Sequence, residues 1–286
     1  MLINCSDKLS QFAKYFAKKH NLTIVQSPIN RFSDGELFIT LPDITYPQSI
    51  YLLINSLDDI SDNLFKLCLL SHSLKLHHQP KEIIAIMPYF PYARQDKQQY
   101  NFSLASDYVL DMLSASGVTK IITWDIHSNI LLENSKIEIQ NIIPYVVFAE
   151  YTKKQMHLKD TVIVAPDQGA STRALLLAKE LGVDLMLAKK TRNVLSVSVN
   201  IPEFIEAAHY IIFDDIIVSG STILKTAESI ISKKPNCKIF IYATHALFTR
   251  ETSQIFNHLN IVQILALFAS NYSINNFNDL KFIDLT

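Results

Sequence analysis

The stretch HYIIFDDIIVSGST, residues 209–222, carries the strongest structural signal in the chain. It starts as a run of aromatic and β-branched residues, which is typical of a buried strand, and passes through two acids into a turn of small hydroxyl residues. Residues 222–234 then place apolar side chains at helical spacing. This succession predicts a strand that ends at Asp215, a turn and then a helix of an open α/β sheet, in which ligands bind at the carboxyl ends of the strands.

The same alternation extends to both sides of this stretch. Further strands are predicted at 49–56, 82–88, 120–124, 161–166, 238–244 and 261–267, and helices at 62–77, 104–116 and 171–181. Strands that are apolar throughout indicate parallel sheets covered by helices on both faces. A less regular region at 129–160 separates two similar series, although the halves share little sequence. The pattern therefore predicts the α/β class with two domains, 1–141 and 142–286.

Composition excludes several kinds of protein. The chain has 286 residues, of which 49% are hydrophobic, and a formal net charge of -1, so it lacks the basic excess of a nucleic-acid-binding protein. We find no export signal and no uninterrupted apolar run of membrane-spanning length. Cys5, Cys68 and Cys237 are widely spaced, which favours reduced thiols in a cytoplasmic protein.

The turn at 218–222 has the features of a phosphate site. Backbone N–H groups, two hydroxyls and the positive end of the following helix would surround one phosphate. Asp214 and Asp215 just before it could accept hydrogen bonds from the hydroxyls of a sugar attached to that phosphate. The simpler alternative is an acidic cap on the helix.

Four other motifs accompany this turn: RFSDGE (31–36), PYARQD (91–96), WDIHS (124–128) and PDQGASTRA (166–174). The turn resembles the phosphoribosyl pyrophosphate loop of type I phosphoribosyltransferases. With the four motifs in this order, the chain resembles the ribose-phosphate pyrophosphokinase family over nearly its whole length. The resemblance implies two similar type I phosphoribosyltransferase-like domains, each with a mainly parallel sheet flanked by helices.

The resemblance also assigns the two substrates. ATP would be bound by Phe32, Asp34, Glu36, Arg94 and Gln95. Ribose 5-phosphate would be bound by Asp214, Asp215, Val218, Ser219, Gly220, Ser221 and Thr222. Val218 stands where many members have Asp, and Ser221 where Gly or Ala is common, but both keep the backbone amides of the turn.

The resemblance further implies magnesium ions held by His127 and Asp167. Magnesium prefers oxygen ligands, so the residues alone favour an ordinary hydrogen-bonded histidine at His127 and leave helix capping open for Asp167. Arg173, in the last of the four motifs, is interpreted as a packing or interface residue.

Catalytic positive charge is expected from Lys190 and Arg192, with Lys189 as the candidate if the register is shifted by one. The implied reaction transfers the diphosphoryl group of ATP to the C1 hydroxyl of ribose 5-phosphate, giving phosphoribosyl pyrophosphate and AMP for nucleotide biosynthesis. The resemblance also implies a homo-oligomer, a dimer or hexamer. The alternatives are a type I phosphoribosyltransferase and a non-catalytic regulatory homologue.

Overall fold

The computed structural model describes residues 1–5, 10–26, 28–41, 43, 48–95, 105–128, 130–192, 197–256, 260–277 and 280–283. The chain divides into two compact units, unit 1 over Met1–Ile142 and unit 2 over Ile143–Ile283. No helix among these residues combines the length and apolar character needed to cross a bilayer.

Unit 1 is built on a parallel sheet of six strands in the order β2-β1-β5-β6-β7-β8. The strands are β1 (Leu2–Asn4), β2 (Ile24–Gln26), β5 (Ser49–Leu53), β6 (Glu82–Met87), β7 (Lys120–Trp124) and β8 (Glu138–Ile142). A separate antiparallel hairpin, β3 (Ile29–Arg31) and β4 (Leu37–Ile39), precedes β5. The central strands are buried along most of their length, as their continuous apolar sequences predict.

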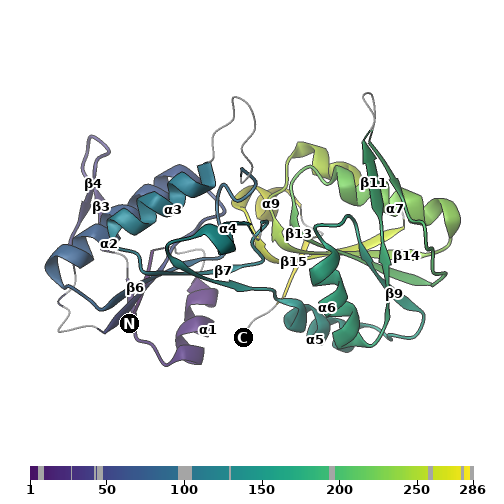
Figure 1. Cartoon of the computed structure of the whole chain (residues 1–286), viewed down its shortest axis with the longest axis horizontal. Helices are drawn as coiled ribbons and strands as arrows, with labels where there is room; N and C mark the ends of the chain where they lie inside the picture. Colours follow the sequence, from purple (N-terminus) through teal and green to yellow (C-terminus); the bar gives the residue numbers. More distant parts are fainter. Residues whose placement is uncertain are drawn as a thin grey trace. The chain divides into compact units, whose positions relative to one another are not determined.

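Helices cover both faces of this sheet. They are α1 (Ser10–His20), α2 (Ile60–His77), α3 (Ala105–Ser116) and the short α4 (Ile130–Asn134). Leu67 of α2 and Leu113 of α3 belong to the same buried cluster as Leu52 of β5. Phe16 of α1 instead packs on Tyr51, the neighbour of Leu52 that faces the opposite side of the sheet. Figure 1 accordingly shows α2 and α3 on one side and α1 on the other.

Unit 2 has a second parallel sheet of six strands, in the order β10-β9-β13-β14-β15-β16. Its strands are β9 (Thr161–Ala165), β10 (Asp184–Leu187), β13 (His209–Ile217), β14 (Lys238–Ala246), β15 (Ile261–Ala269) and β16 (Leu280–Phe282). The antiparallel hairpin β11 (Lys189–Arg192) and β12 (Val197–Asn200) precedes β13. The helices are α5 (Tyr145–Gln155), α6 (Ser171–Leu181), α7 (Ser221–Lys233), α8 (Ser253–Phe256), which follows a 3-10 turn at Arg250–Thr252, and α9 (Asn271–Asn276).

Neighbouring residues of β13 mark the two faces of this sheet. Ile212 belongs to a buried cluster with Ile223 and Ile230 of α7. Phe213 points to the other face, where its ring lies 4.8 Å from that of Phe148 in α5. In Figure 1, α7 accordingly lies on one side of the sheet and α5 and α6 on the other. Burying both faces stabilises the central strand, on which the two acids lie.

The two units repeat one topology. In each, a strand, a helix and an edge strand are followed by a hairpin, and the chain then returns to the other side of the first strand. By chain order β13 and α7 correspond to β5 and α2, and the hairpin β11–β12 corresponds to β3–β4. This confirms the predicted fold class of two α/β units with parallel sheets flanked by helices.

One local prediction was wrong. The sequence suggested that the strand ends at Asp215, but β13 continues to Ile217. The reason is that Ile216 and Ile217 keep their pairing with His245 and Ala246 of the long strand β14. The acids therefore lie inside the strand, and Ser221 and Thr222 are already the first residues of α7.

Candidate active site

The two acids of β13 lie in a largely buried environment. Asp215 is buried, and the side chain of Asp214 is only 13% exposed. The backbone N–H of Asp215 donates a 2.9 Å hydrogen bond to Asp214 Oδ1, which orients the Asp214 carboxylate. Burial, and after it the negative charge of Asp215, raise the pKa of Asp214 well above its ordinary value. Keeping both carboxylates ionised here requires a nearby cation.

Arg173 supplies this cation from the first turn of α6. Its Nη1 lies 3.6 Å from Asp214 Oδ1 and 3.8 Å from Asp215 Oδ1. The same nitrogen donates a 3.1 Å hydrogen bond to the carbonyl of Gly169. The positive charge of Arg173 lowers the pKa of Asp214, against the effects of burial and of Asp215. The sequence predicts a packing or interface role for Arg173, whereas its buried guanidinium lies beside the acid pair.

The turn between β9 and α6 orients a third acid. Asp167 Oδ1 accepts a 3.2 Å hydrogen bond from the N–H of Ala170. A Cβ atom at Gly169 would lie only 3.2 Å from the same oxygen, so a larger residue would crowd this carboxylate. The charge of Asp167 also raises the pKa of Asp214. The three acids and Arg173 therefore form one electrostatic group within unit 2.

The turn between β13 and α7 has the backbone that its sequence predicts. Gly220 adopts the left-handed conformation with φ of 74°, and a Cβ there would lie 2.0 Å from Ile255 Cδ1. Ser219 and Ser221 are exposed, whereas Val218 and Thr222 are half-buried. The N–H groups of the first turn of an α-helix have no carbonyl partner inside the helix, so the start of α7 suits an anion.

The predicted catalytic residues lie in β11. Lys190 pairs with Val199 and Arg192 with Val197 in the hairpin, while the side chains of Lys190 and Arg192 fall outside the described part of the structure. Lys189, the alternative candidate, is exposed. The base of the hairpin is attached to α7, because Lys233 Nζ donates a 2.7 Å hydrogen bond to the carbonyl of Ile201.

In unit 1, RFSDGE forms the tip of the β3–β4 hairpin. The N–H of Phe32 donates to the carbonyl of Glu36 at 2.9 Å, and the N–H of Glu36 donates to Asp34 Oδ1 at 3.1 Å. The Phe32 ring is 55% exposed and lies 4.3 Å from the ring of Phe38. All three predicted ATP residues of this motif are therefore held at an exposed tip.

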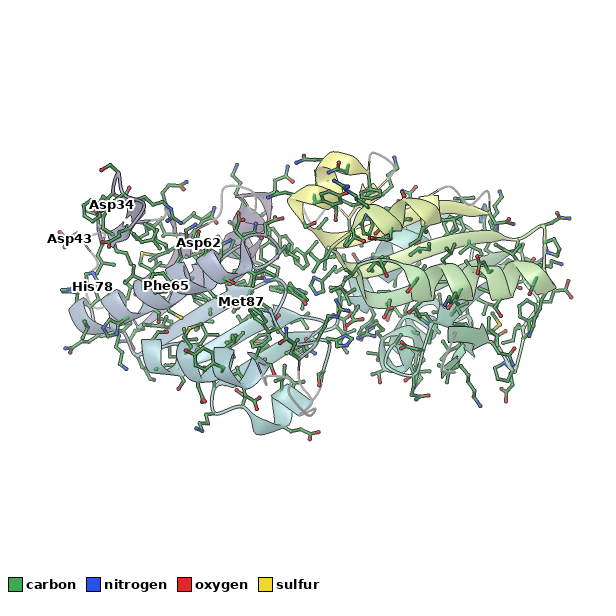
Figure 2. The ribbon with its side chains drawn as sticks, turned by 90° about the horizontal axis from the view of Figure 1, so that it is seen from above. Asp34, Asp43, Asp62, Phe65, His78 and Met87 are labelled. Carbon is green, nitrogen blue, oxygen red and sulfur yellow. The ribbon has the colours of Figure 1, made fainter. Side chains whose placement is uncertain are left out.

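The beginning of α2 contacts both ATP motifs of unit 1. Asp62 Oδ1 accepts a 2.5 Å hydrogen bond from Arg31, whose other Nη donates to the carbonyl of Gly35 in the hairpin. Figure 2 shows Asp34 on this hairpin and Asp62 on α2. The hydroxyl oxygens of Ser61 and Tyr92 lie 3.0 Å apart, which connects the PYARQD segment to the same helix turn.

The PYARQD segment itself has an uncommon backbone. Tyr92 has φ of 61°, which is unusual for a bulky residue, and its carbonyl accepts a 2.8 Å hydrogen bond from the N–H of Gln95. Tyr89 and Phe90 are buried beneath the segment, and Arg94 and Gln95 are exposed. Buried aromatic residues therefore lie next in sequence to the exposed Arg94 and Gln95. Residues 96–104 lie outside the described part.

His127 follows β7 in unit 1 and is exposed. The preceding turn is fixed because Ile126 N–H donates a 3.0 Å hydrogen bond to Asn141 Oδ1 and Asp125 N–H donates to the Ile142 carbonyl at 3.0 Å. Asp125 is buried and has a left-handed backbone with φ of 45°. His127 belongs to unit 1 and Asp167 to unit 2.

Comparison with known proteins identifies the family. Residues 1–117 match the model of the N-terminal domain of ribose phosphate pyrophosphokinase. The chain is 30% identical over 242 residues to the ribose-phosphate pyrophosphokinase of Wolinella succinogenes, covering 84% of this chain and 77% of that protein. The chain belongs to the ribose-phosphate pyrophosphokinase family. The Campylobacter jejuni ribose-phosphate pyrophosphokinase gives the same identity and coverage.

The fold of a family member has also been solved. Phosphoribosylpyrophosphate synthetase from Mycobacterium smegmatis matches with a TM-score of 0.82 and 23% identity, over 99% of this chain and 93% of that one. At this identity the likeness shows the fold alone. It agrees with the two α/β units described above.

The site residues can be compared with what magnesium requires. Within the described ranges, no three His, Cys, Asp or Glu side chains gather as a group that could hold a metal ion. Magnesium usually keeps several waters and binds one or two carboxylates together with substrate phosphates. The oriented carboxylate of Asp167 fits such a site, and the exposed imidazole of His127 is a less suitable ligand for this hard cation.

The sequence indicates the acids and the turn as candidates but does not indicate the residues that hold them in place. In unit 2 this residue is Arg173, and in unit 1 they are Arg31 and Tyr92, which contact α2. A signal for Arg173 was available. Arg173, Leu177 and Leu181 lie four residues apart on the buried stripe of α6, and a charge on such a stripe needs a buried partner.

Proposed function

We propose that this chain is a ribose-phosphate diphosphokinase, which transfers the β,γ-diphosphoryl group of ATP to the C1 hydroxyl of ribose 5-phosphate. The oxygen of that hydroxyl attacks the β-phosphorus, the bond from the β-phosphorus to the bridging oxygen of AMP breaks, and the hydroxyl proton is released. The observation that carries the proposal is the buried acid pair Asp214–Asp215 next to the small-residue turn, in a chain of this family.

The sugar phosphate would be bound by unit 2. Asp214 and Asp215 accept hydrogen bonds from the 2- and 3-hydroxyls of ribose, since carboxylates are acceptors. The 5-phosphate sits on the turn from Val218 to Thr222, where the amides and hydroxyls meet the positive end of α7. The same acids would repel a phosphate placed over the ribose ring. The sugar would therefore bind with its hydroxyls toward the acids and its 5-phosphate toward the turn.

The nucleotide would be bound by the motifs of unit 1. The exposed Phe32 ring offers a surface for the adenine base, and Asp34 and Glu36 offer acceptors beside it. The guanidinium of Arg94 suits the triphosphate, and Gln95 suits the base or the ribose. We further propose a homo-oligomer, a dimer or hexamer, because in this family the RFSDGE motif often acts across a subunit boundary.

Diphosphoryl transfer depends mainly on alignment and on compensation of charge. Lys190 and Arg192 would compensate the charge that develops on the β-phosphorus oxygens. Magnesium ions, one held by His127 and a second held by Asp167, each together with substrate oxygens, would add positive charge to the phosphates. Val218 in place of an acid removes one negative charge from the turn but leaves its amides.

We place the protein in the cytoplasm. In the described part of the structure, Cys5, Cys68 and Cys237 form no disulfide, which suits a reducing compartment.

An assay with ATP, ribose 5-phosphate and magnesium separates this proposal from its alternatives. The diphosphokinase releases AMP only when ribose 5-phosphate is present. A type I phosphoribosyltransferase would instead release pyrophosphate from phosphoribosyl pyrophosphate when a base is added. A regulatory homologue would do neither, and either of these results would reject the proposal.

A further inference from the structure

Three charged side chains are buried together in unit 2. Their exposed fractions are 8% for Arg173, 13% for Asp214 and 6% for Asp215. The carboxylates come from consecutive residues of β13, and the guanidinium comes from the first turn of α6. Two negative charges thus lie beside the positive charge of Arg173 in a place where water screens them poorly.

The Nη1 atom of Arg173 compensates the charge of both acids from beyond hydrogen-bond distance. Its Nη1 lies 3.6 Å from Asp214 Oδ1 and 3.8 Å from Asp215 Oδ1, beyond the range of a hydrogen bond. Its 3.1 Å hydrogen bond goes instead to the Gly169 carbonyl, in the turn that also carries Asp167. The guanidinium is therefore anchored on one loop of the site while its charge acts on the acids of the neighbouring strand.

We propose that Arg173 is a positioning residue for the sugar: it holds the carboxylates of Asp214 and Asp215 together as acceptors for the ribose hydroxyls. This inference rests on the proposed function. Without the cation, the two carboxylates repel each other at close range and turn apart, so that the 2- and 3-hydroxyls lose their paired acceptors. The turn at 218–222 binds the 5-phosphate through its own amides and does not depend on Arg173.

A purely structural ion pair makes a different prediction. Removing it would loosen unit 2 as a whole, and every ligand of the site would bind less well. If Arg173 is a positioning residue, its removal weakens only the contact between the protein and the ribose hydroxyls. Comparing two sugar phosphates that differ in one hydroxyl separates these roles.

The experiment titrates the full-length chain with ribose 5-phosphate and with 2-deoxyribose 5-phosphate by calorimetry. The ratio of the two affinities measures the contact with the 2-hydroxyl, and we expect about tenfold or more for a hydrogen bond to a buried carboxylate. In Arg173→Gln we expect this ratio to fall close to one, because the deoxy sugar loses only the contact of its 3-hydroxyl whereas ribose 5-phosphate loses the contacts of both hydroxyls. In Arg173→Lys, which keeps a charge but loses the planar fork, an intermediate ratio is expected.

Lys179→Gln is the matched control, because Lys179 is an exposed cation of the same helix, and its ratio should equal that of the wild type. An unchanged ratio in Arg173→Gln would overturn the inference. Equal weakening of both sugars, or failure of both Arg173 variants to fold, would also overturn it, because the residue would then be needed for structure alone. If the wild-type protein binds neither sugar, the proposed function fails instead.

Discussion

The side-chain hydroxyl of Thr252 donates a 2.5 Å hydrogen bond to the backbone carbonyl of Val218. The same carbonyl accepts a 3.2 Å hydrogen bond from the N–H of Thr249. Thr252 is fully buried, and its side-chain oxygen also accepts from the N–H of Thr249 at 3.0 Å. The segment after β14 therefore fixes the first residue of the proposed phosphate turn.

Replacing Thr252 tests whether this contact positions the turn. Thr252→Val leaves the methyl group in place but removes the donor, so we expect a loss of about 1–3 kcal/mol in the free energy of unfolding. We expect the affinity for ribose 5-phosphate to fall about tenfold, equivalent to about 1.4 kcal/mol. Thr252→Ser keeps the hydroxyl and should bind the sugar almost as the wild type does. If Thr252→Val loses stability but not affinity, the contact supports the fold only.

A side chain at position 220 should destabilise the protein. The φ of 74° at Gly220 disfavours any Cβ, and the added atom would lie 2.0 Å from Ile255 Cδ1 and 2.9 Å from Ile255 Cγ1. Gly182 is the matched control, because its φ of 68° is similar but nothing lies within 4 Å of its Cβ position. Gly182→Ala should cost about 1–2 kcal/mol for the left-handed backbone.

Gly220→Ala should cost about 1–3 kcal/mol more than this control, because Ile255 must also move, and it should weaken ribose 5-phosphate binding. Denaturant unfolding and calorimetry measure the two effects. Equal losses of stability in the two alanine variants would show that Ile255 moves aside without lowering the free energy of unfolding.

Asp214 should lower the stability of the protein at neutral pH. Its pKa is raised in the folded state, first by burial and then by Asp215. A raised pKa means that this carboxyl stabilises the fold below its ordinary pKa and that this contribution is lost as the pH rises through the folded-state value. Asp214→Asn removes the charge and leaves Asp215 paired with Arg173.

We therefore expect Asp214→Asn to melt at a higher temperature than the wild type at pH 8, by about 2–4 °C for each kcal/mol gained. The difference should shrink as the pH falls toward about 4, where the wild-type carboxyl is protonated. Affinity for ribose 5-phosphate should fall in the same variant. Asp184→Asn, at an exposed position of β10, is the control. A lower melting temperature for Asp214→Asn at pH 8 would contradict the assignment of this charge as destabilising.

The contact between Arg31 and Asp62 should affect ATP but not the sugar. This ion pair is 46% and 39% exposed, so Asp62→Asn should change stability by less than about 1 kcal/mol. Because the hairpin loses this contact with α2, we expect the KM for ATP to rise about threefold to tenfold while the affinity for ribose 5-phosphate stays constant.

Glu138→Gln removes another surface ion pair of unit 1, formed with Lys120, and serves as the control. It should leave both substrates unaffected. Steady-state kinetics with each substrate varied in turn provide the measurement. An unchanged KM for ATP in Asp62→Asn would show that the position of the hairpin does not affect nucleotide binding.

The elements of the fold could be predicted because their signals are local. Apolar runs such as 82–88 and 161–166 are typical of parallel strands buried on both faces, and the small residues around Gly220 indicate a turn. The extra length of β13 could not be predicted, because it depends on the pairing of Ile216 and Ile217 with β14.

The supporting contacts of the site were harder to predict for the same reason. Arg173 and Asp214 are forty-one positions apart, and Thr252 and Val218 are thirty-four apart, so nothing in the local sequence joins them. A charged residue at a buried position is expected to have a partner, but the local sequence does not identify which residue that partner is. Only the three-dimensional arrangement within unit 2 identifies which acids Arg173 compensates.

The most direct test of diphosphoryl transfer follows the wild-type chain by ³¹P NMR with ATP, ribose 5-phosphate and magnesium. We predict AMP and phosphoribosyl pyrophosphate in equal amounts, no ADP, and a rate reduced about a hundredfold or more in Lys190→Ala but not in Lys189→Ala. Release of ADP, or of AMP without the sugar phosphate, would contradict the account.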